Sequence, residues 1–565
     1  MLRPAAAAAD HGPVLLLLAA IPVFLLFLGA NSIWDANEAF YVETPRQMIE
    51  RGDYVTPVFN GAERLNKPVL SYWIVAGFYH LFGVSVATER IAIALGALGI
   101  IAATFLIGRA LHSAATGVWA GIFVATAPRF VFFSRRIFID IYLCLFLSLA
   151  LAAFALVERY PEHRRRYLLL MYVALGLGVL TKGPVALALP ALACLMWLAL
   201  ERRLRDVRRL MILPGALIIL AIVAPWVLAI YLRLGLEPIW AFIGVENLER
   251  YRTAMTGERP IWFLFSVLFG DLLMPWAPLL GGVLLSILRR ERGQAPTGAA
   301  SLRRLLWIWI GVIVVFFSLS ASKEDLYILP VVPAAAVIIA DALMRSQFGR
   351  QSPALRLVFI GIAVVCVALG IVVWTGLRAG PFAIAAAPLV GLLLVVAGAG
   401  GLAMLVVGRP ATAFVVTASA FVALNYVFVA IVLPRAEATK PIPPIAQLLA
   451  DRASPGSQLG AYNMMLPSLV FYANRPVRDL TEAEAAAWLA GTTESWLVTG
   501  EAEWEALRVR VPSACIALRR TLFPFDRIKP SSLFRPEPPP QVLLVTNKCG
   551  GRLAGSGDRP MTRRQ

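Results

Sequence analysis

The chain has 565 residues, of which 59% are hydrophobic and only 15% are charged, and its formal net charge is +18. Soluble domains are roughly 45–50% apolar and about 25% charged, so a compact soluble protein has no interior large enough for so much apolar sequence. The composition also excludes an intrinsically disordered chain and, with five cysteines, a disulfide-rich secreted scaffold. A polytopic membrane protein remains. Its basic excess is typical of cytoplasmic membrane edges, so no nucleic-acid partner is expected.

Thirteen apolar runs approach the roughly 20 residues that a helix needs to cross a bilayer. In chain order they are 13–31, 88–110, 115–133, 138–157, 167–181, 184–200, 210–233, 264–288, 305–320, 328–343, 357–377, 382–407 and 411–433. The runs 167–181 and 184–200 are short and nearly contiguous, which predicts a tight helical hairpin. The first run could instead be a cleaved signal peptide, because Leu28-Gly29-Ala30 resembles a cleavage site. Its long apolar core favours a retained helix.

Arginines gather in alternate connections, at residues 159–166, 202–209, 289–304 and 345–356. The positive-inside rule places these connections in the cytoplasm. The N-terminus then lies in the cytoplasm, and the C-terminal region and the remaining connections lie outside. The outer connections are 32–87, 134–137, 181–183, 234–263, 321–327 and 378–381.

The region after residue 433 differs from the membrane part, 1–433. Short β-like runs stand at 457–462, 495–499, 515–520 and 541–546, with helical patterns between them. Thr481 and Glu484 form a capping box before a short helix. We therefore predict an all-α polytopic membrane protein with a small outer α/β domain at 434–550, followed by a disordered tail at 551–565.

Two cysteines, Cys515 and Cys549, fall in the predicted outer domain. An oxidising compartment would allow them to pair, but the sequence is equally compatible with two free thiols. Cys144, Cys194 and Cys366 lie in apolar runs and are interpreted as small core residues.

The chemistry should face outward, because the cytoplasmic connections are short and carry no nucleotide-binding motif. In the first outer loop, Asp35 and Glu38 lie three residues apart and would share one helix face. Two such carboxylates could supply a general base and a positioning group. They could equally be a helix-capping pair. Apolar residues at Tyr41, Pro45, Met48 and Ile49 predict an amphipathic helix in the membrane interface, and 68–82 predicts a second one.

Lysine is rare in this chain, with six lysines against 46 arginines. Three of the six, Lys67, Lys182 and Lys323, lie at outward-facing span edges. A lysine ammonium is a compact charge suited to phosphate oxygens. The alternative is that these side chains merely snorkel at the membrane boundary. A chain that otherwise uses arginine for positive charge favours the binding role.

Two further charged positions are unusual for a membrane edge. Asp140 begins the fourth span, where a carboxylate is costly and indicates a functional site, unless it caps the helix or pairs with Arg136. The loop 234–263 carries Glu246, Arg250, Arg252 and Arg259 on the outer side. These arginines could meet an anionic substrate or decorate an exposed loop.

Five segments, in the same order, resemble motifs of the aminoarabinose transferase and protein mannosyltransferase group, which are integral-membrane glycosyltransferases of the GT-C superfamily. They are the first outer loop (IWDANEAFYVETPRQMIERGDYVTPVFNG with RLNKPVLSYW), RRIFIDIYL around Asp140, LTKGPVAL around Lys182, ENLERY before MPWAPLL, and SKEDLYILP around Lys323 and Tyr327. The resemblance covers most of the membrane part and includes thirteen spans with an outer C-terminal domain.

The resemblance implies transfer of a sugar from a polyprenyl-phosphate carrier to a lipid, glycan or protein acceptor at the outer face of the bacterial plasma membrane. The site residues of the family fall on Asn37, Glu38, Lys67, Asp140, Lys182 and Tyr327. The first acid of the family pair is therefore an amide here, and Asp35 is the nearest carboxylate. The Glu often found before the Lys-Pro motif is Asn66. Both departures leave open which carboxylate is the base and whether a divalent cation takes part.

The chemistry of such a transfer fits these residue types. The leaving lipid phosphate gains negative charge, which positioned cations stabilise, and Lys67 is the first choice with Arg250 second. The acceptor hydroxyl needs a base, for which Asp35, Glu38 or Asp140 could serve. The remaining candidates for substrate binding are Asn37, Asn66, Lys182, Lys323 and Tyr327.

Two other functions stay open from sequence. A transporter or flippase for a lipid or an anionic solute would suit thirteen spans, although it should show internal repeats and charges at the midplane. A catalytically silent relative that binds lipid-linked glycans would explain Asn37.

Overall fold

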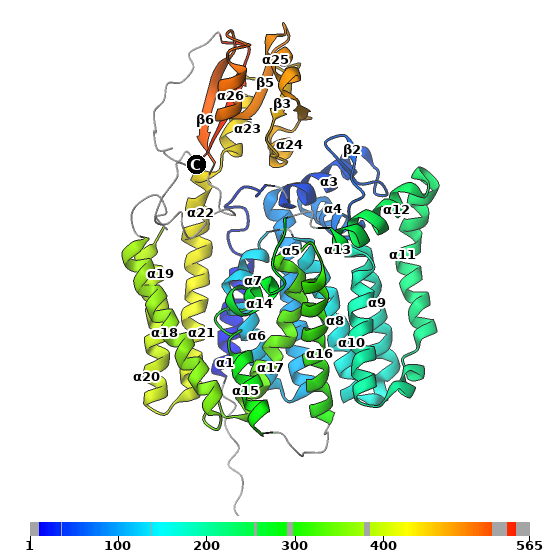
Figure 1. Ribbon diagram of the computed structural model, residues 1–565, viewed down its shortest axis with the longest axis vertical. Helices are drawn as coiled ribbons and strands as arrows, with labels where there is room; N and C mark the ends of the chain where they lie inside the picture. Colours follow the sequence, from blue (N-terminus) through cyan, green and yellow to red (C-terminus); the bar gives the residue numbers. More distant parts are fainter. Residues whose placement is uncertain are drawn as a thin grey trace, which may run out of the picture. The chain divides into compact units, whose positions relative to one another are not determined.

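The computed structural model describes residues 11–35, 37–136, 138–253, 257–290, 298–377, 385–522 and 540–549 (Figure 1). The predicted tail, 551–565, lies outside these residues. The chain divides into two compact units. The helical unit comprises Met1–Ala30, Thr44–Pro57 and Glu63–Pro434, and the C-terminal unit comprises Asn31–Glu43, Val58–Ala62 and Arg435–Gln565.

Within the described residues, eight helical segments are long and apolar enough to cross a membrane. They are α5 (Val86–Leu111), α8 (Ile139–Arg159), α11 (Ile212–Leu234), α16 (Gly298–Leu319), the segment Asp325–Arg345 with α17 (Val332–Arg345), α18 (Pro353–Gly376), the segment Ala387–Val406 with α19 (Ala387–Val395) and α20 (Gly401–Val406), and the segment Pro410–Thr439 with α21 (Pro410–Val427). The chain is thus a multi-pass membrane protein, as its composition indicates. The count of thirteen spans stays a prediction.

Shorter helices complete the helical unit. They are α1 (Gly12–Ala20), α2 (Pro22–Leu25), α4 (Leu70–Phe82), α6 (Ala114–Thr126), α7 (Pro128–Phe133), α9 (Arg164–Lys182), α10 (Val185–Leu200), α12 (Glu237–Ile243), α13 (Arg250–Arg252), α14 (Phe263–Val267) and α15 (Leu279–Arg290). The helix α3 (Asn37–Arg51) begins in the C-terminal unit and ends in the helical unit. The hairpin predicted from 167–181 and 184–200 is formed by α9 and α10. The helices expected in the first outer loop are α3 and α4.

Several predicted spans are interrupted in the described residues, and two of them show the role of proline. The run 115–133 splits into α6 and α7 at Pro128, and the run 264–288 splits into α14, the π-helical turn η4 (Leu268–Leu272) and α15. Pro275 and Pro278 lie between η4 and α15. Proline has no N–H and clashes with the preceding turn, so a continuous apolar run does not guarantee a continuous helix.

Glycine allows close helix packing at several crossings, of which α5–α6 and α18–α19 are examples. A Cβ atom on Gly108 of α5 would lie 2.8 Å from the Cα atom of Gly117 on α6. A Cβ atom on Gly370 of α18 would lie 2.7 Å from the carbonyl oxygen of Gly391 on α19. Small residues let helix backbones approach closely, as is common in membrane helix pairs.

The C-terminal unit contains a five-stranded mixed sheet in the order β4-β3-β5-β7-β6. The strands are β3 (Gln458–Tyr462), β4 (Arg478–Leu480), β5 (Ser495–Gly500), β6 (Cys515–Thr521) and β7 (Gln541–Thr546). β3 runs parallel to β4 and β5, and β7 runs antiparallel to β5 and β6. The predicted α/β character is confirmed, and within the five strands of this sheet the short strand β4 was not expected.

Helices cover both faces of this sheet. They are α23 (Ile442–Arg452), α24 (Ser468–Ala473), α25 (Glu482–Ala490) and α26 (Glu501–Leu507). Trp496 and Val498 of β5 pack in one core with α23 and α24, whereas Leu497 packs in a second core with α25 and α26. Successive side chains of a strand point to opposite faces, so a strand buried on both faces is continuously apolar. The predicted capping box at Thr481 and Glu484 is present at the start of α25.

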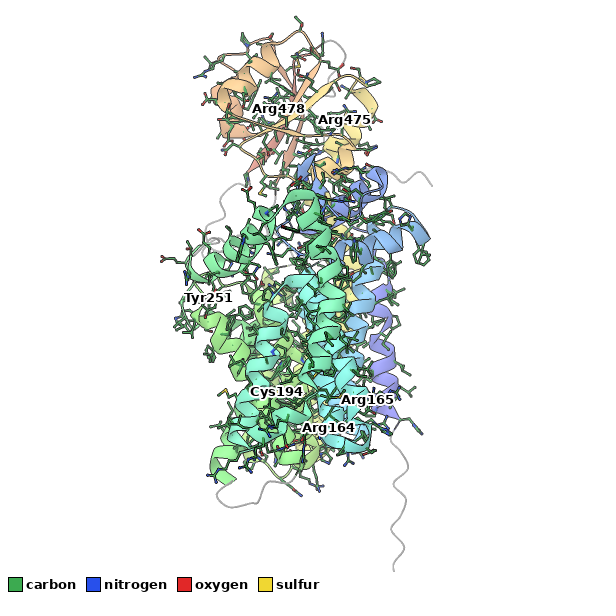
Figure 2. The ribbon with its side chains drawn as sticks, turned by 90° about the vertical axis from the view of Figure 1, so that its right-hand side faces the viewer. Arg164, Arg165, Cys194, Tyr251, Arg475 and Arg478 are labelled. Carbon is green, nitrogen blue, oxygen red and sulfur yellow. A yellow bond between two sulfur atoms is a disulfide. The ribbon has the colours of Figure 1, made fainter. Side chains whose placement is uncertain are left out.

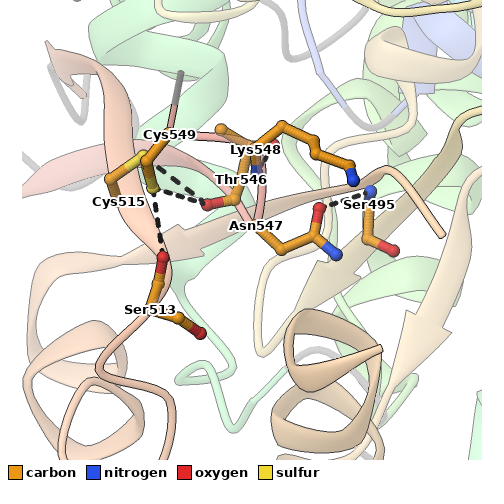
Figure 3. The surroundings of a disulfide bond; sticks show 7 residues. All are labelled: Ser495, Ser513, Cys515, Thr546, Asn547, Lys548 and Cys549. Carbon is orange, nitrogen blue, oxygen red and sulfur yellow. Dashed lines mark hydrogen bonds between the residues drawn. A yellow bond between two sulfur atoms is a disulfide. The ribbon is translucent and has the colours of Figure 1, made fainter. Parts of the chain in front are cut away.

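A disulfide joins Cys515 of β6 to Cys549, which follows β7 (Figure 3). The two strands are neighbours in the sheet, and the Cα atoms lie 5.9 Å apart. The structure therefore decides between the two states that the sequence left open.

Candidate active site

The segment before α4 carries a buried ion pair. The Lys67 ammonium lies 2.6 Å from the Glu246 carboxylate, and both side chains are only 14% exposed. The Asn66 amide donates a hydrogen bond of 3.0 Å to the other carboxylate oxygen. Arg250, one helical turn after Glu246, lies 3.8 Å from the same carboxylate. The Glu246 carboxylate therefore contacts three candidate substrate-binding residues, which come from two loops distant in sequence.

Burial changes the proton affinity of this pair. It lowers the pKa of Lys67 to about 8 even though Glu246 stabilises the ammonium, and the nearby charges of Arg250 and Lys182 lower it further. Burial by itself would raise the pKa of Glu246. The charge of Lys67 and the hydrogen bonds from Lys67 and Asn66 outweigh this effect and hold the pKa below its ordinary value.

A second ion pair lies where α8 begins and α9 ends. Asp140, in the first turn of α8, accepts a hydrogen bond from Lys182, the last residue of α9. The Lys182 ammonium also lies 4.7 Å from the centre of the Tyr327 ring, within the range of a cation–π interaction. Tyr327 belongs to the turn η5 (Asp325–Val331) that leads into α17.

The loop around Glu246 also packs next to Lys182. Gly183 follows α9 with a φ of +90°, and a Cβ atom there would lie 2.7 Å from the Phe242 ring of α12. The Asn247 amide in turn donates to the Phe242 carbonyl over 2.8 Å. A left-handed glycine without a side chain thus lets the loop approach the end of α9 closely.

Six predicted site residues therefore meet in one region of the helical unit. They are Asn66, Lys67, Asp140, Lys182, Arg250 and Tyr327. We call this set, together with Glu246, the cation cluster. Figure 2 shows Arg164 and Arg165 near one end of the helical unit and Tyr251, the neighbour of Arg250, nearer the other end. The cluster is distant from the arginine-rich connection that precedes α9.

Lys323 is buried but takes part in neither ion pair of the described cluster. Its segment is tied to the chain that follows Arg250. The Ala321 amide donates to the Tyr251 carbonyl over 2.8 Å, and the Ser322 hydroxyl donates to the Thr253 carbonyl over 2.8 Å. The expected role of Lys323 in substrate binding stays a prediction.

Three candidates near the start of the first outer loop, Asp35, Asn37 and Glu38, lie in the C-terminal unit. The Ser468 amide donates to the Asp35 carboxylate over 2.7 Å, and the Trp34 amide donates to the Glu38 carboxylate over 2.7 Å. Asn37 is exposed at the start of α3, whereas Glu38 is fully buried. Glu38 thus reaches back across the start of the helix, as a capping residue does, whereas Asp35 bonds to a residue far along the chain.

Glu246 is the site residue that the sequence interpretation missed. It was recognised only as one charge in a long loop. Its spacing of four residues from Arg250 was the available signal, because such residues share one face of a helix. The structure adds that it supplies a carboxylate to Lys67, where position 66 holds an amide.

A metal site is not evident in the described residues. These residues contain no group of three or more His, Cys, Asp or Glu side chains that could hold a metal ion. Asn66 donates its amide hydrogen to Glu246. The residues present at this point therefore do not fit a cation site built on the Lys-Pro motif.

Comparison with known proteins confirms the predicted resemblance. A family model described as dolichyl-phosphate-mannose-protein mannosyltransferase matches residues 14–234. An undecaprenyl phosphate-alpha-4-amino-4-deoxy-L-arabinose arabinosyl transferase of Pseudomonas fluorescens (strain Pf0-1) is 30% identical over 357 residues, which are 60% of this chain and 59% of that protein. A protein of Aquifex aeolicus (strain VF5) is 29% identical over 67% of this chain and 72% of its own length. The chain thus spans about three fifths of the length of the arabinosyl transferase that it matches.

A solved structure shows the same fold. The crystal structure of ArnT from Cupriavidus metallidurans bound to undecaprenyl phosphate matches 97% of this chain and 100% of that chain, with a TM-score of 0.77 and 23% identity. The chain therefore has the fold of this transferase. In sequence it is similar to membrane glycosyltransferases whose names specify lipid-phosphate-linked sugars.

Proposed function

We propose that this protein is a glycosyltransferase that moves a sugar from a polyprenyl-phosphate donor to a lipid, glycan or protein acceptor. The observation that carries the proposal is the cation cluster. Lys67, Lys182 and Arg250 come from three separate stretches of a helical bundle and surround two carboxylates. A relative of the same fold binds undecaprenyl phosphate, whose phosphate is the kind of anion that such cations recognise.

Lys67 and Arg250 bind the donor phosphate in this proposal. Both now face the Glu246 carboxylate, at 2.6 and 3.8 Å. The donor phosphate replaces that carboxylate as their partner and brings the negative charge that they stabilise during transfer. Lys182 and Tyr327 line the adjacent part of the proposed donor site.

The chemical step requires a base and a leaving phosphate. The acceptor hydroxyl oxygen attacks the anomeric carbon, the bond from that carbon to the phosphate oxygen breaks, and the hydroxyl proton passes to a carboxylate. The products are the glycosylated acceptor and polyprenyl phosphate. Asp140 is our first choice for the base because it lies within the cation cluster, and Glu38 is the second.

The proposal also places each domain relative to the membrane. Residues 1–433 form the membrane transferase domain of a bacterial inner-membrane protein with a cytoplasmic N-terminus. Residues 434–550 form a periplasmic domain. The arginine-rich connections and the disulfide between Cys515 and Cys549 support this orientation, because disulfides persist in oxidising compartments.

A transfer assay tests the function. The full chain is purified in detergent and incubated with synthetic polyprenyl-phosphate sugars and total membrane lipids, and products are identified by mass spectrometry. Removal of one stabilising donor usually costs about 100- to 1,000-fold in turnover, so we expect Lys67→Ala and Asp140→Ala to lose transfer to about this extent. Lys548→Ala and Asp451→Ala, which remove exposed charges in the C-terminal unit, are the matched controls.

Two outcomes would reject the proposal. One is full turnover by well-folded Lys67→Ala and Asp140→Ala variants. The other is movement of the donor lipid across vesicles without any glycosylated product, which would instead favour a flippase.

A further inference from the structure

Residues 32–35 have no regular secondary structure, yet residues far along the chain in the same C-terminal unit form hydrogen bonds with them. The Ser32 amide donates to the Glu437 carboxylate over 2.9 Å, and the Ile33 amide donates to the Tyr472 hydroxyl over 2.7 Å. The Ser468 amide donates to the Asp35 carboxylate over 2.7 Å. These contacts lie within one compact unit although they join residues more than 400 positions apart.

Lys440 makes further contacts with residues 32–34. Its ammonium donates to the carbonyls of Ser32 and Ile33 and lies 4.1 Å from the centre of the Trp34 ring. It also pairs with Glu437 over 3.4 Å, and its side chain is only 10% exposed. Every residue from 32 to 35 therefore has a partner in the C-terminal region. We call Glu437, Lys440, Ser468 and Tyr472 the anchor residues.

The hairpin after α3 is formed by β1 (Val58–Phe59) and β2 (Ala62–Glu63), and its residues 58–62 belong to the same unit. The Asn60 amide group forms two hydrogen bonds with the backbone of Val477, donating over 2.6 Å and accepting over 3.0 Å. Phe59 packs against the core that contains α23 and α24 and contacts Phe40 of α3 at 4.7 Å between ring centres. The start of α3 is thus fixed from both sides, by the segment before it and by the hairpin after it.

The role of Asp35 follows from its contact. Its carboxylate accepts an N–H from Ser468, and an amide oxygen in the same place could accept the same bond. A general base, in contrast, needs a group that gains a proton, which an amide does not do at neutral pH. Conservative replacement by asparagine therefore separates the two roles.

We infer that Asp35 is a positioning residue and not the base, and that the C-terminal domain acts as a clamp that fixes the start of α3. The clamp acts through Asp35 and the anchor residues, and it holds the segment that carries Asn37 and Glu38. This inference rests on the proposed transfer activity, in which Glu38 is a candidate for the base. It assigns residues 434–550 an indirect part in catalysis, exerted through the position of the segment that carries Asn37 and Glu38.

The decisive test compares Asp35→Asn with Asp35→Ala in the purified full chain. We expect Asp35→Asn to keep at least about half of the wild-type kcat and an unchanged pH profile, because the bond to Ser468 survives. We expect Asp35→Ala to lower kcat about tenfold or more with little change in the KM for the donor, since the loop loses a hydrogen bond to a charged group. A base would behave differently. Equal losses in both variants, about 100-fold or more, with loss of the acidic limb of the pH profile, would overturn the inference.

Tyr472 provides an independent variant. Tyr472→Phe removes the hydroxyl that accepts from Ile33 and keeps the ring, so we expect a kcat several-fold lower with the domain still folded. Tyr462→Phe is the matched control, because Tyr462 packs against the other core of the same sheet. Equal activity of the wild type and Tyr472→Phe would contradict the clamp.

Hydrogen–deuterium exchange tests the clamp without any activity. In Asp35→Ala, the peptide containing Ser468 should exchange about tenfold faster or more, whereas in Asp35→Asn it should match the wild type. Unchanged exchange in Asp35→Ala would refute the clamp even if the enzyme proved active. Faster exchange in a protein without transferase activity would reject the proposed function and leave the clamp standing.

Discussion

The unusual acidity of Lys67 predicts how donor use should depend on pH. Burial lowers the pKa of this ammonium to about 8, well below its ordinary value of 10.5. The group binds phosphate only when it is protonated. In the free protein it loses its charge as the pH rises through about 8, so kcat/KM for the donor should fall on the alkaline side.

The size of the effect follows from the titration. With a pKa of about 8, roughly nine tenths of the molecules carry the Lys67 charge at pH 7 and roughly one tenth carry it at pH 9. We therefore expect kcat/KM for the donor to fall about tenfold between these two values. The value of kcat should change less, because a bound phosphate stabilises the ammonium and raises its pKa in the complex.

The assay is initial-rate sugar transfer at subsaturating donor over pH 6.5–9.5. Lys67→Arg is the diagnostic variant, because guanidinium stays protonated throughout this range and its alkaline limb should vanish. Lys548→Arg, at an exposed site, should keep the limb. The same alkaline limb in Lys67→Arg and the wild type would refute the assignment and show that another group titrates.

Three further changes have defined outcomes. Glu246→Gln removes the charge that holds the Lys67 proton and competes for its ammonium. The alkaline limb of donor kcat/KM should therefore move to lower pH, because Lys67 loses its proton more easily. Equal profiles in variant and wild type would contradict the pairing. Asp140→Asn should lower kcat about 100-fold or more if this carboxylate is the base. Circular dichroism would confirm that the variant is folded. A loss of kcat smaller than about threefold would exclude that role. Replacing both Cys515 and Cys549 by serine opens a loop of 34 residues. The free energy of unfolding of the C-terminal domain should fall by about 4 kcal/mol. Urea titration of tryptophan fluorescence in the full chain measures this change. A cost below about 1 kcal/mol would show that the loop is constrained by other contacts.

The local elements were readable from sequence because short-range physics determines them. The apolar run 88–110 became α5 (Val86–Leu111), and the strand predicted at 541–546 is β7. The capping box at Thr481 and Glu484 was visible as a four-residue pattern. Each of these signals lies within one stretch of chain, as backbone hydrogen bonding and side-chain periodicity require.

The interruptions of helices were less readable. The run 264–288 is apolar for most of its length, with Asp271 as its one charged residue, and its two prolines were the local signal that η4 and α15 would be separate. Hydropathy measures how strongly a segment prefers lipid to water, but it does not indicate where the backbone bends. The short strand β4 was missed for a related reason, because three residues are too few to show a period of two.

The residue types of the site were determined by the sequence, and their partners were decided by the tertiary structure. Scarce lysines at span edges already indicated Lys67 and Lys182 as candidates. The partner of Lys67, however, is Glu246, 179 residues away, and the partner of Asp35 is Ser468, 433 residues away. Such pairs depend on which helices and strands pack together. Long-range packing sums many weak contacts over the whole chain, and no local pattern records that sum.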